Sequence, residues 1–252
     1  MKKEVLVMLE VNSISKKFGD FHAVDQISFK ANQGEVLGFL GPNGAGKSTT
    51  MKMITGFLES TAGDITVCGK SILENTLEAQ KNIGYVPENA PLYEEMFVRE
   101  FLEFIAKIRE VPRSKITERV DKVIQTCALE EVEYQRLETL SKGYKRRVSL
   151  AQSLVHDPKV LILDEPTDGL DPNQKHDVRI LIKELAKEKC ILISTHILEE
   201  VEEVCDRCII IGKGKKLFEG TPDELRSMSN KGRIQDVFRA ITTGDQLEGV
   251  AV

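Results

Sequence analysis

Short runs of apolar residues, bounded by Gly, Pro, Asn, Asp or charged residues, recur along the chain. Runs this short and almost continuously apolar are typical of strands buried on both faces, as in a parallel sheet. The strands predicted on this basis are Glu35–Leu40, Asp64–Cys68, Asn82–Val86, Lys159–Asp164, Cys190–Thr195 and Arg207–Gly212. Helical patterns lie between several of them, notably over Asn173–Lys189 and Ile197–Val204. This alternation predicts an α/β fold.

The stretch from Pro91 to His156 breaks the alternation, because it contains no convincing strand. Its periodicity predicts three helices instead, over Val98–Arg109, Ser114–Cys127 and Ser141–Val155. Pro112 and the Ser at the start of the second helix separate the first two. The simplest interpretation is a helical subdomain inserted into the α/β core.

A length of 252 residues fits one large domain, or a core domain with an inserted subdomain. We therefore expect a single domain over residues 1–252. Its expected parts are a core at about 1–90 and 157–220, a helical subdomain at about 91–156 and a C-terminal helical tail at about 221–252. The tail begins with a capped helix at Thr221–Leu225 and ends in a weaker helical stretch near Ile234–Ile241.

Composition and charge narrow the functional classes. Hydrophobic residues make up 41% and charged residues 30% of the chain, as in ordinary globular proteins. The formal net charge of −5 argues against a protein that binds nucleic acid through bulk electrostatics. No apolar run approaches the roughly 18 residues of a membrane-spanning helix, and Val5–Leu9 is too short for a signal peptide. We therefore expect a cytoplasmic chain with neither a signal peptide nor a transmembrane segment.

A glycine-rich motif follows the first predicted strand and opens a helical stretch. The segment GPNGAGKST fits the phosphate-binding pattern G-x-x-x-x-G-K-[ST] without substitution. Its glycines let the backbone fold around phosphate oxygens, and the following helix directs its positive dipole end at the same anion. Lys47 is expected to reach the terminal phosphates, and Ser48 to offer a hydroxyl to Mg²⁺. The predicted ATP-binding residues of this loop are Gly41, Pro42, Asn43, Gly44, Ala45, Gly46, Lys47, Ser48 and Thr49.

A second part of the site is predicted where the strand Lys159–Asp164 ends in the segment VLILDEP. Asp164 can face Mg²⁺ through water from the end of this buried strand. Glu165 follows immediately, and a carboxylate beside the nucleotide that is not committed to the metal can polarise an attacking water. This pair is a weak signal alone, but behind a phosphate-binding loop it indicates nucleotide hydrolysis.

With these residues, the sequence from Leu9 to Gly220 resembles the nucleotide-binding subunits of ABC transporters. Residues 140–144, LSKGY, resemble the family's LSGGQ signature, and the segment ending in Asp171 matches its D-loop. His196 matches the switch histidine, and Phe18 lies where the family places an aromatic side chain that stacks on adenine.

The resemblance implies a fold and a set of roles. The implied fold is a P-loop NTPase core with a mixed sheet, an N-terminal antiparallel β subdomain and an inserted α-helical subdomain. The implied catalytic residues are Glu165, His196 and Lys47. ATP and Mg²⁺ are the implied cofactors, with Ser48, Asp164 and Glu88 expected at the metal.

Two departures from the family pattern stand out. The signature carries Lys142 and Tyr144 where the consensus has Gly and Gln, although Ser141 and Gly143 remain. We expect Ser141, Lys142 and Gly143 to meet the ATP of an opposite subunit. The family usually has Gln where this chain has Glu88, which can still ligate Mg²⁺ or orient water but adds a negative charge.

The segments IGYVPENAPLYEEM and LSKGYKRRVSLAQSLVHDP are similar to those of the ABC-2-type exporter subfamily, with its gliding-motility and multidrug members. The resemblance implies a head-to-tail dimer, of identical copies or of this chain with a paralogue, in which each ATP lies between one subunit's loop and the other's signature. Work would be delivered to a separately encoded transmembrane permease at the cytoplasmic face of the cell membrane, without nucleic acid. The expected contact is a groove lined near Glu88–Met96.

Three other classes of protein fit the sequence less well. A soluble ABC ATPase acting on ribosomes or DNA usually carries two nucleotide domains or long coiled coils, and neither occurs here. A small-molecule kinase would not need the signature, D-loop and switch histidine in this order. A nucleotide-binding regulator with a degraded site is disfavoured by the intact residues Lys47, Ser48, Asp164, Glu165 and His196.

Overall fold

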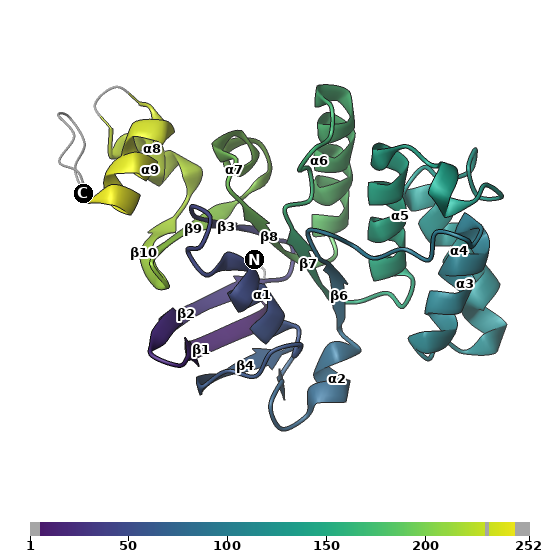
Figure 1. The fold of residues 1–252 in the computed structure, drawn as a ribbon, viewed down its shortest axis with the longest axis horizontal. Coiled ribbons are helices and arrows are strands. Elements are labelled where there is room, and N and C mark those ends of the chain that lie inside the picture. Colours follow the sequence, from purple (N-terminus) through teal and green to yellow (C-terminus); the bar gives the residue numbers. More distant parts are fainter. Residues whose placement is uncertain (1–5, 230–231, 245–252) are drawn as a thin grey trace, which may run out of the picture.

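The computed structural model describes residues 6–229 and 232–244. Val5 and the end of the predicted tail, residues 245–252, lie outside this range. Two β-sheets are layered together, and helices cover the other face of the larger sheet (Figure 1). The predicted fold class, with a mixed sheet, an antiparallel sheet and an inserted group of helices, is confirmed.

The larger sheet has the strand order β10-β9-β3-β8-β7-β6. Its strands are β3 (Val36–Leu40), β6 (Ile83–Val86), β7 (Val160–Asp164), β8 (Cys190–Thr195), β9 (Arg207–Gly212) and β10 (Lys215–Gly220). All neighbours pair in parallel except β9 and β10, which form an antiparallel hairpin. The parallel strands agree with the predicted runs, whereas β10 gives no continuous apolar signal because none of its residues is buried and Lys215, Lys216 and Glu219 are charged.

Burial on both faces explains the continuous apolar runs. In β3, Leu37 and Phe39 join the core between the two sheets, whereas Val36 and Leu40 join the core beneath the helices. Every residue of β3 and β7 is buried. The carboxyl ends of these parallel strands therefore emerge side by side from a rigid centre, which is where ligands bind in such sheets.

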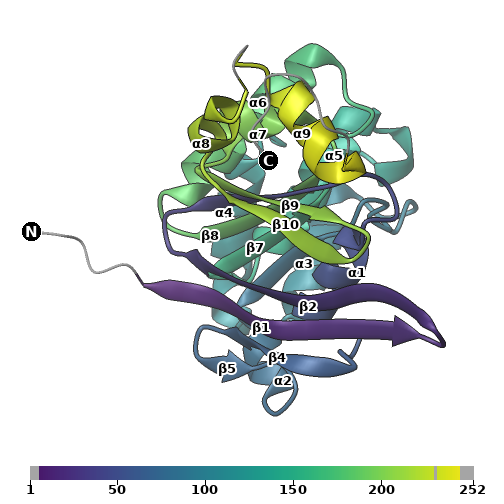
Figure 2. The ribbon, with the colours of Figure 1, turned by 90° about the vertical axis from the view of Figure 1, so that its left-hand side faces the viewer.

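The smaller sheet is antiparallel, with the order β2-β1-β4-β5. Its strands are β1 (Val7–Phe18), β2 (Phe21–Asn32), β4 (Ala62–Val67) and β5 (Lys70–Ser71). β1 and β2 form a long hairpin that crosses the molecule (Figure 2). Register shifts interrupt the pairing of this hairpin, so its burial does not alternate regularly and the sequence pattern does not delimit the two strands.

The predicted helical subdomain contains α3 (Val98–Ile108), α4 (Ile116–Thr126) and α5 (Lys142–Leu154). Short 3-10 turns at Arg113–Lys115 and Leu137–Thr139 precede α4 and α5. Between residues 91 and 156, all of which the structure describes, β pairing is limited to one bridge between Phe97 and Arg136. The group lies at the side of the sheet that ends in β6 (Figure 1).

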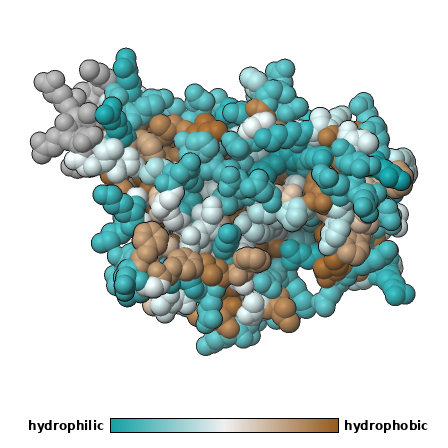
Figure 3. All heavy atoms as spheres, viewed as in Figure 1, coloured by the Kyte–Doolittle hydropathy of each residue, from teal (hydrophilic) through white to brown (hydrophobic). Residues whose placement is uncertain are grey.

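The remaining helices are α1 (Lys47–Ile54), α2 (Thr76–Gln80), α6 (Pro172–Ala186), α7 (Leu198–Val204), α8 (Pro222–Ser227) and α9 (Ile234–Thr243). Thr221 caps α8 together with Glu224, as predicted. Figure 2 shows α8 and α9 beside the β9–β10 hairpin. Within residues 6–229 and 232–244, no helix has the length and apolar character needed to cross a bilayer. The view in Figure 3 is mostly hydrophilic, with smaller apolar areas that include one over the β1–β2 hairpin.

Candidate functional site: a nucleotide cavity at the ends of β3, β7 and β8

The glycine-rich loop connects β3 to α1, as the motif predicts. Gly46 has a φ of +107°, and a Cβ there would lie 2.6 Å from the carbonyl oxygen of Ala23 in β2. Both the backbone conformation and the space therefore require glycine at this position. The loop is pressed against the β1–β2 hairpin, which brings residues near the N-terminus to the edge of the phosphate cradle.

Lys47, the first residue of α1, points back into the loop and is 6% exposed. Its Nζ donates hydrogen bonds to the carbonyl oxygens of Gly41 at 2.8 Å and Pro42 at 3.4 Å. The same ammonium lies 3.6 Å from Oε1 of Glu165. The loop thus holds a buried positive charge beside the residue predicted to be the general base.

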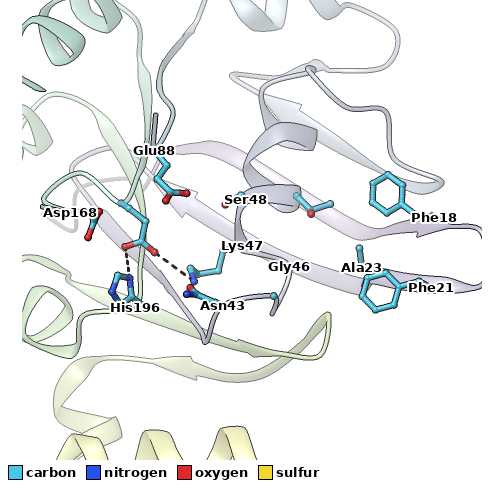
Figure 4. A pocket seen from close by; sticks show the side chains of 13 residues that line it. Phe18, Phe21, Ala23, Asn43, Gly46, Lys47, Ser48, Glu88, Asp168 and His196 are labelled. Atoms are coloured by element: carbon cyan, nitrogen blue, oxygen red, sulfur yellow. Dashed lines mark hydrogen bonds and ion pairs between the residues drawn. The ribbon is translucent and has the colours of Figure 1, made fainter. Parts of the chain in front are cut away.

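Glu165 is 7% exposed and lies between two partners. Its Oε2 is 2.9 Å from Nδ1 of His196, and Lys47 faces its other oxygen (Figure 4). The backbone N–H of Glu165 donates to the carbonyl oxygen of Ser194 at 3.0 Å, and its φ of +48° is seldom adopted by non-glycine residues. Such conformations persist where the surroundings impose them, often at active sites. The carboxylate is therefore held in one orientation from both its backbone and its side chain.

A cavity of about 760 Å³ opens beside this row of side chains (Figure 4). Its lining residues are Phe18, Phe21, Ala23, Asn43, Gly44, Gly46, Lys47, Ser48, Thr49, Glu88, Glu165, Asp168 and His196. The phosphate loop and Glu165 form one end, and the two phenylalanines lie at the other. A nucleotide has the same polarity, with charged phosphates at one end and an apolar base at the other.

Not every predicted ligand residue reaches this cavity. Asp164 is 2% exposed, and its carboxylate accepts a hydrogen bond from the Ser194 hydroxyl. Burial, with the negative charges of Asp164 and Glu88, raises the pKa of the Tyr85 hydroxyl to about 12. Of the residues predicted to contact ATP or Mg²⁺ within one chain, those that are not among the lining residues are Gly41, Pro42, Ala45 and Asp164.

Comparison with known proteins decides the family. A model of the ABC transporter family matches residues 24–168, which contain the loop, the signature and Glu165. This chain belongs to the ABC transporter family. It is the ATP-binding subunit of an ABC transporter, and the family hydrolyses ATP to power transport.

Individual relatives agree with this assignment. The chain is 36% identical over 242 residues to the uncharacterized ABC transporter ATP-binding protein YxlF of Bacillus subtilis (strain 168), covering 96% of this chain and 79% of that one. It is 40% identical over 220 residues to the Nod factor export ATP-binding protein I of Rhizobium sp. (strain N33), covering 87% and 72%. A solved ATP binding subunit of an ABC transporter superposes with a TM-score of 0.82 at 29% identity, covering 93% of this chain and 99% of that one. The predicted resemblance to this family is confirmed.

The ABC signature lies outside the chain's own nucleotide cavity. Ser141 caps α5 by accepting a hydrogen bond from the N–H of Tyr144 at 3.3 Å, and Lys142 reaches across to Gly169. Gly143 is buried, and a Cβ there would lie 2.6 Å from Cδ of the Gln174 side chain. A larger residue at this position would therefore displace the end of the Gln174 side chain, and none of the three signature residues lines the cavity.

The D-loop residue Asp171 also lies away from the cavity. Its side chain accepts hydrogen bonds from the N–H groups of Asn173 and Gln174, both at 3.0 Å, and so caps α6. In this chain the carboxylate therefore has a local structural role.

Three lining residues, Phe21, Ala23 and Asp168, were missed by sequence reasoning. Phe21 pairs with Phe18 across the tip of the β1–β2 hairpin, so both rings reach the same end of the cavity. The spacing of these aromatics around Gly19 and Asp20 is a usable signal for this arrangement. Asp168, three positions after Glu165, had no distinguishing signal because any polar loop carries such residues.

Proposed function

We propose that this chain works in a head-to-tail dimer that closes on two ATP molecules and drives a separately encoded transmembrane permease, as an exporter at the cytoplasmic face of the membrane. The observation that carries the dimer is that Ser141, Lys142 and Gly143 do not line the cavity formed by the loop of the same chain. A second copy, or a paralogue, supplies them. The Nod factor export relative supports export.

Within that dimer, Lys47 holds the terminal phosphates and Phe18 and Phe21 hold the base. Glu165 accepts a proton from the attacking water, and His196 orients the water and the γ-phosphate. Both residues already face the phosphate end of the cavity. The carboxylate is aligned by His196 before the substrate arrives.

Mg²⁺ prefers oxygen ligands, and the side chains at the phosphate end offer them. Ser48 and Glu88 line the cavity and are suited to hold the ion directly, while Asp164 lies behind them and is suited to act through water. When bound, Mg²⁺ neutralises charge on the transferred phosphate. Within the described residues no group of three or more His, Cys, Asp or Glu side chains is placed to hold a metal ion.

The permease contact is proposed at a groove beside the helical subdomain. A hollow of about 370 Å³ is lined there by residues 88–92, by Glu94 and by residues of α5. Glu94 forms an ion pair with Lys145 of α5 at 2.9 Å. The hollow shares Glu88 and Asp168 with the nucleotide cavity, so an occupant of the groove and the nucleotide would meet the same two residues.

Mixing two inactive variants tests the shared site. Lys47→Ala disables the cradle, and Ser141→Arg blocks the signature. In a head-to-tail dimer of one copy of each, one ATP site has both its cradle and its signature intact. We expect ATP-dependent dimers and partial hydrolysis on mixing, and neither with one variant alone. Folded variants that never complement each other, with no dimer on a sizing column, would contradict the proposal.

Co-purification tests the permease. A tagged copy expressed in its native host should be recovered from detergent-solubilised membranes together with a multi-spanning protein. Recovery from the soluble fraction alone would contradict the membrane partner and leave the ATPase assignment intact.

A further inference from the structure

The side chain of Arg146 is 9% exposed in the middle of α5, two positions after the signature. Arginine is rarely buried unless its charge is paired or its N–H groups are satisfied. Burial lowers the pKa of Arg146, and the charges of nearby carboxylates, Asp164 foremost, oppose that effect. The buried guanidinium must therefore be compensated by its hydrogen bonds.

All five N–H groups of the Arg146 guanidinium can be matched to backbone carbonyl oxygens. Nε donates to Pro166 at 2.8 Å, and Nη1 donates to Pro87 and Glu88, both at 3.2 Å. Nη2 donates to Asp164 at 2.9 Å and to Glu165. Since a guanidinium has five donors in a fixed plane, five acceptors saturate it.

These carbonyls belong to two segments that are distant in sequence. Pro87 and Glu88 follow β6, whereas Asp164 ends β7, the parallel neighbour of β6 in the sheet, and Glu165 and Pro166 follow it. Arg146 itself belongs to the helical subdomain. One side chain thus joins the helix that begins at the signature to the loop of Glu88 and the loop of Glu165.

We propose that Arg146 is a positioning residue that makes the orientation of Glu165 depend on the position of α5. The inference rests on the proposed role of Glu165 as general base. The N–H of Glu165 is bound to Ser194 and its carbonyl oxygen to Arg146, so its unusual φ is held from both sides. Movement of α5 relative to β7 strains both of these hydrogen bonds at the same time. The backbone of Glu165 then rotates, and its carboxylate rotates with it. Engagement of the signature is in this way transmitted to the general base.

Two substitutions distinguish a positioning role of Arg146 from a purely structural role. Arg146→Gln removes the charge and leaves too few donors for both loops, while Arg146→Lys keeps the charge but has three donors on one nitrogen. The matched control is Arg147→Gln, because Arg147 is the next residue of α5 but pairs with Asp177 at 2.7 Å. The readouts are kcat, the Kd for a fluorescent ATP analogue, and amide hydrogen exchange in peptides that cover residues 83–92 and 160–170.

For Arg146→Gln we expect kcat to fall at least about tenfold, since small displacements of a catalytic group are costly, with Kd changed less than about twofold. Exchange should rise in both loop peptides and stay unchanged in β3 and β8. Arg146→Lys should recover only part of kcat, and Arg147→Gln should behave as wild type.

A native kcat with native exchange in both loops would overturn the proposal, as would equal defects in Arg147→Gln or faster exchange throughout the chain. Failure of both Arg146 variants to fold would assign the residue a purely structural role. If the wild-type protein does not hydrolyse ATP, the role of Glu165 fails, while the exchange comparison still decides whether Arg146 joins the two loops.

Discussion

The Nδ1 atom of His196 lies 2.9 Å from Oε2 of Glu165, although the two residues are 31 positions apart in sequence. They follow neighbouring parallel strands, β8 and β7, whose register aligns Ser194 with Asp164. In the proposed mechanism this contact holds the general base beside the residue that orients the γ-phosphate. Substitution of either residue of this pair should therefore affect ATP hydrolysis more than ATP binding.

Glu165→Gln should abolish steady-state ATP hydrolysis and preserve ATP binding. The amide cannot accept the proton of water, and a lost general base typically costs about 10²–10⁴ in rate. The phosphate loop is untouched, so an ATP-bound dimer should accumulate on a sizing column. Glu184→Gln is the control, because Glu184 is exposed and pairs with Lys187. Near-native turnover by Glu165→Gln would show that another group is the base.

Lys47→Ala and His196→Ala should have different effects on nucleotide affinity and on turnover. Lys47 provides the charge for the phosphates, so its loss should lower both nucleotide affinity and turnover. In the proposed mechanism His196 acts on water and γ-phosphate in line, so its loss should lower turnover and spare affinity. Titration of a fluorescent ATP analogue and a phosphate-release assay measure the two effects.

Lys52→Ala is the matched control for this pair, because Lys52 is an exposed residue of the same helix as Lys47. It should match wild type in both assays. An equal loss of affinity in Lys47→Ala and His196→Ala would count against the role assigned to His196.

Glu88→Gln should make nucleotide binding less dependent on Mg²⁺. Glu88 lines the cavity together with Glu165 and Asp168, so its charge opposes the phosphates when the metal is absent and is tolerated when it is bound. We expect a higher ATP affinity than wild type without Mg²⁺ and a smaller change at saturating Mg²⁺. Glu95→Gln, at an exposed residue outside the cavity lining, is the control. Superimposable curves for Glu88→Gln and wild type in both conditions would refute this role.

Phe18→Ala and Phe21→Ala should each weaken ATP binding. Both rings line the base end of the cavity, and an aromatic pair contributes about 0.5–1.5 kcal/mol, or roughly 2- to 12-fold in affinity. Phe57→Ala is the control, since Phe57 is 79% exposed and does not line the cavity. A loss confined to Phe18→Ala would remove Phe21 from the site.

His156 should make the protein less stable in mild acid. Burial, aided by the positive charges of Arg109 and Lys189, lowers the pKa of His156 from 6.5 to about 4, while its hydrogen bond to Ile83 and the charge of Asp157 oppose the shift. Between these values the unfolded chain binds a proton that the folded chain does not. The stabilising contribution is therefore complete above pH 6.5 and is lost as pH falls towards 4.

The size of this effect has an upper bound of about 3 kcal/mol, at 1.36 kcal/mol for each pKa unit. His156→Gln keeps a donor for the carbonyl oxygen of Ile83 and should flatten the pH dependence of the unfolding free energy. Urea unfolding at pH 4.5 and 7 measures this pH dependence, and His176→Gln is the control because His176 is exposed. Parallel profiles for wild type and His156→Gln would exclude His156 as the source.

The sequence by itself determined the parallel strands and which polar residues stand at their ends. Strands such as β7 and β8 are buried on both faces, and this leaves a local apolar signature in the sequence. The phosphate loop is also local, because its glycines, Lys47 and Ser48 act within one continuous segment. Glu165 was predicted because it directly follows a strand of this kind, whereas His196, at the end of the next strand, was predicted from its match to the family's switch histidine.

Only the tertiary structure decided what meets across the chain. Phe21 joins the cavity through hairpin pairing, and Arg146 finds its acceptors on two loops far from it in sequence. The tertiary structure also places Ser141 away from the cavity formed by the phosphate loop of its own chain. It gives Asp171 a role as the cap of α6. Side-chain periodicity reports which face of an element is buried, whereas these contacts depend on how whole elements are placed by packing, and no local pattern encodes that placement.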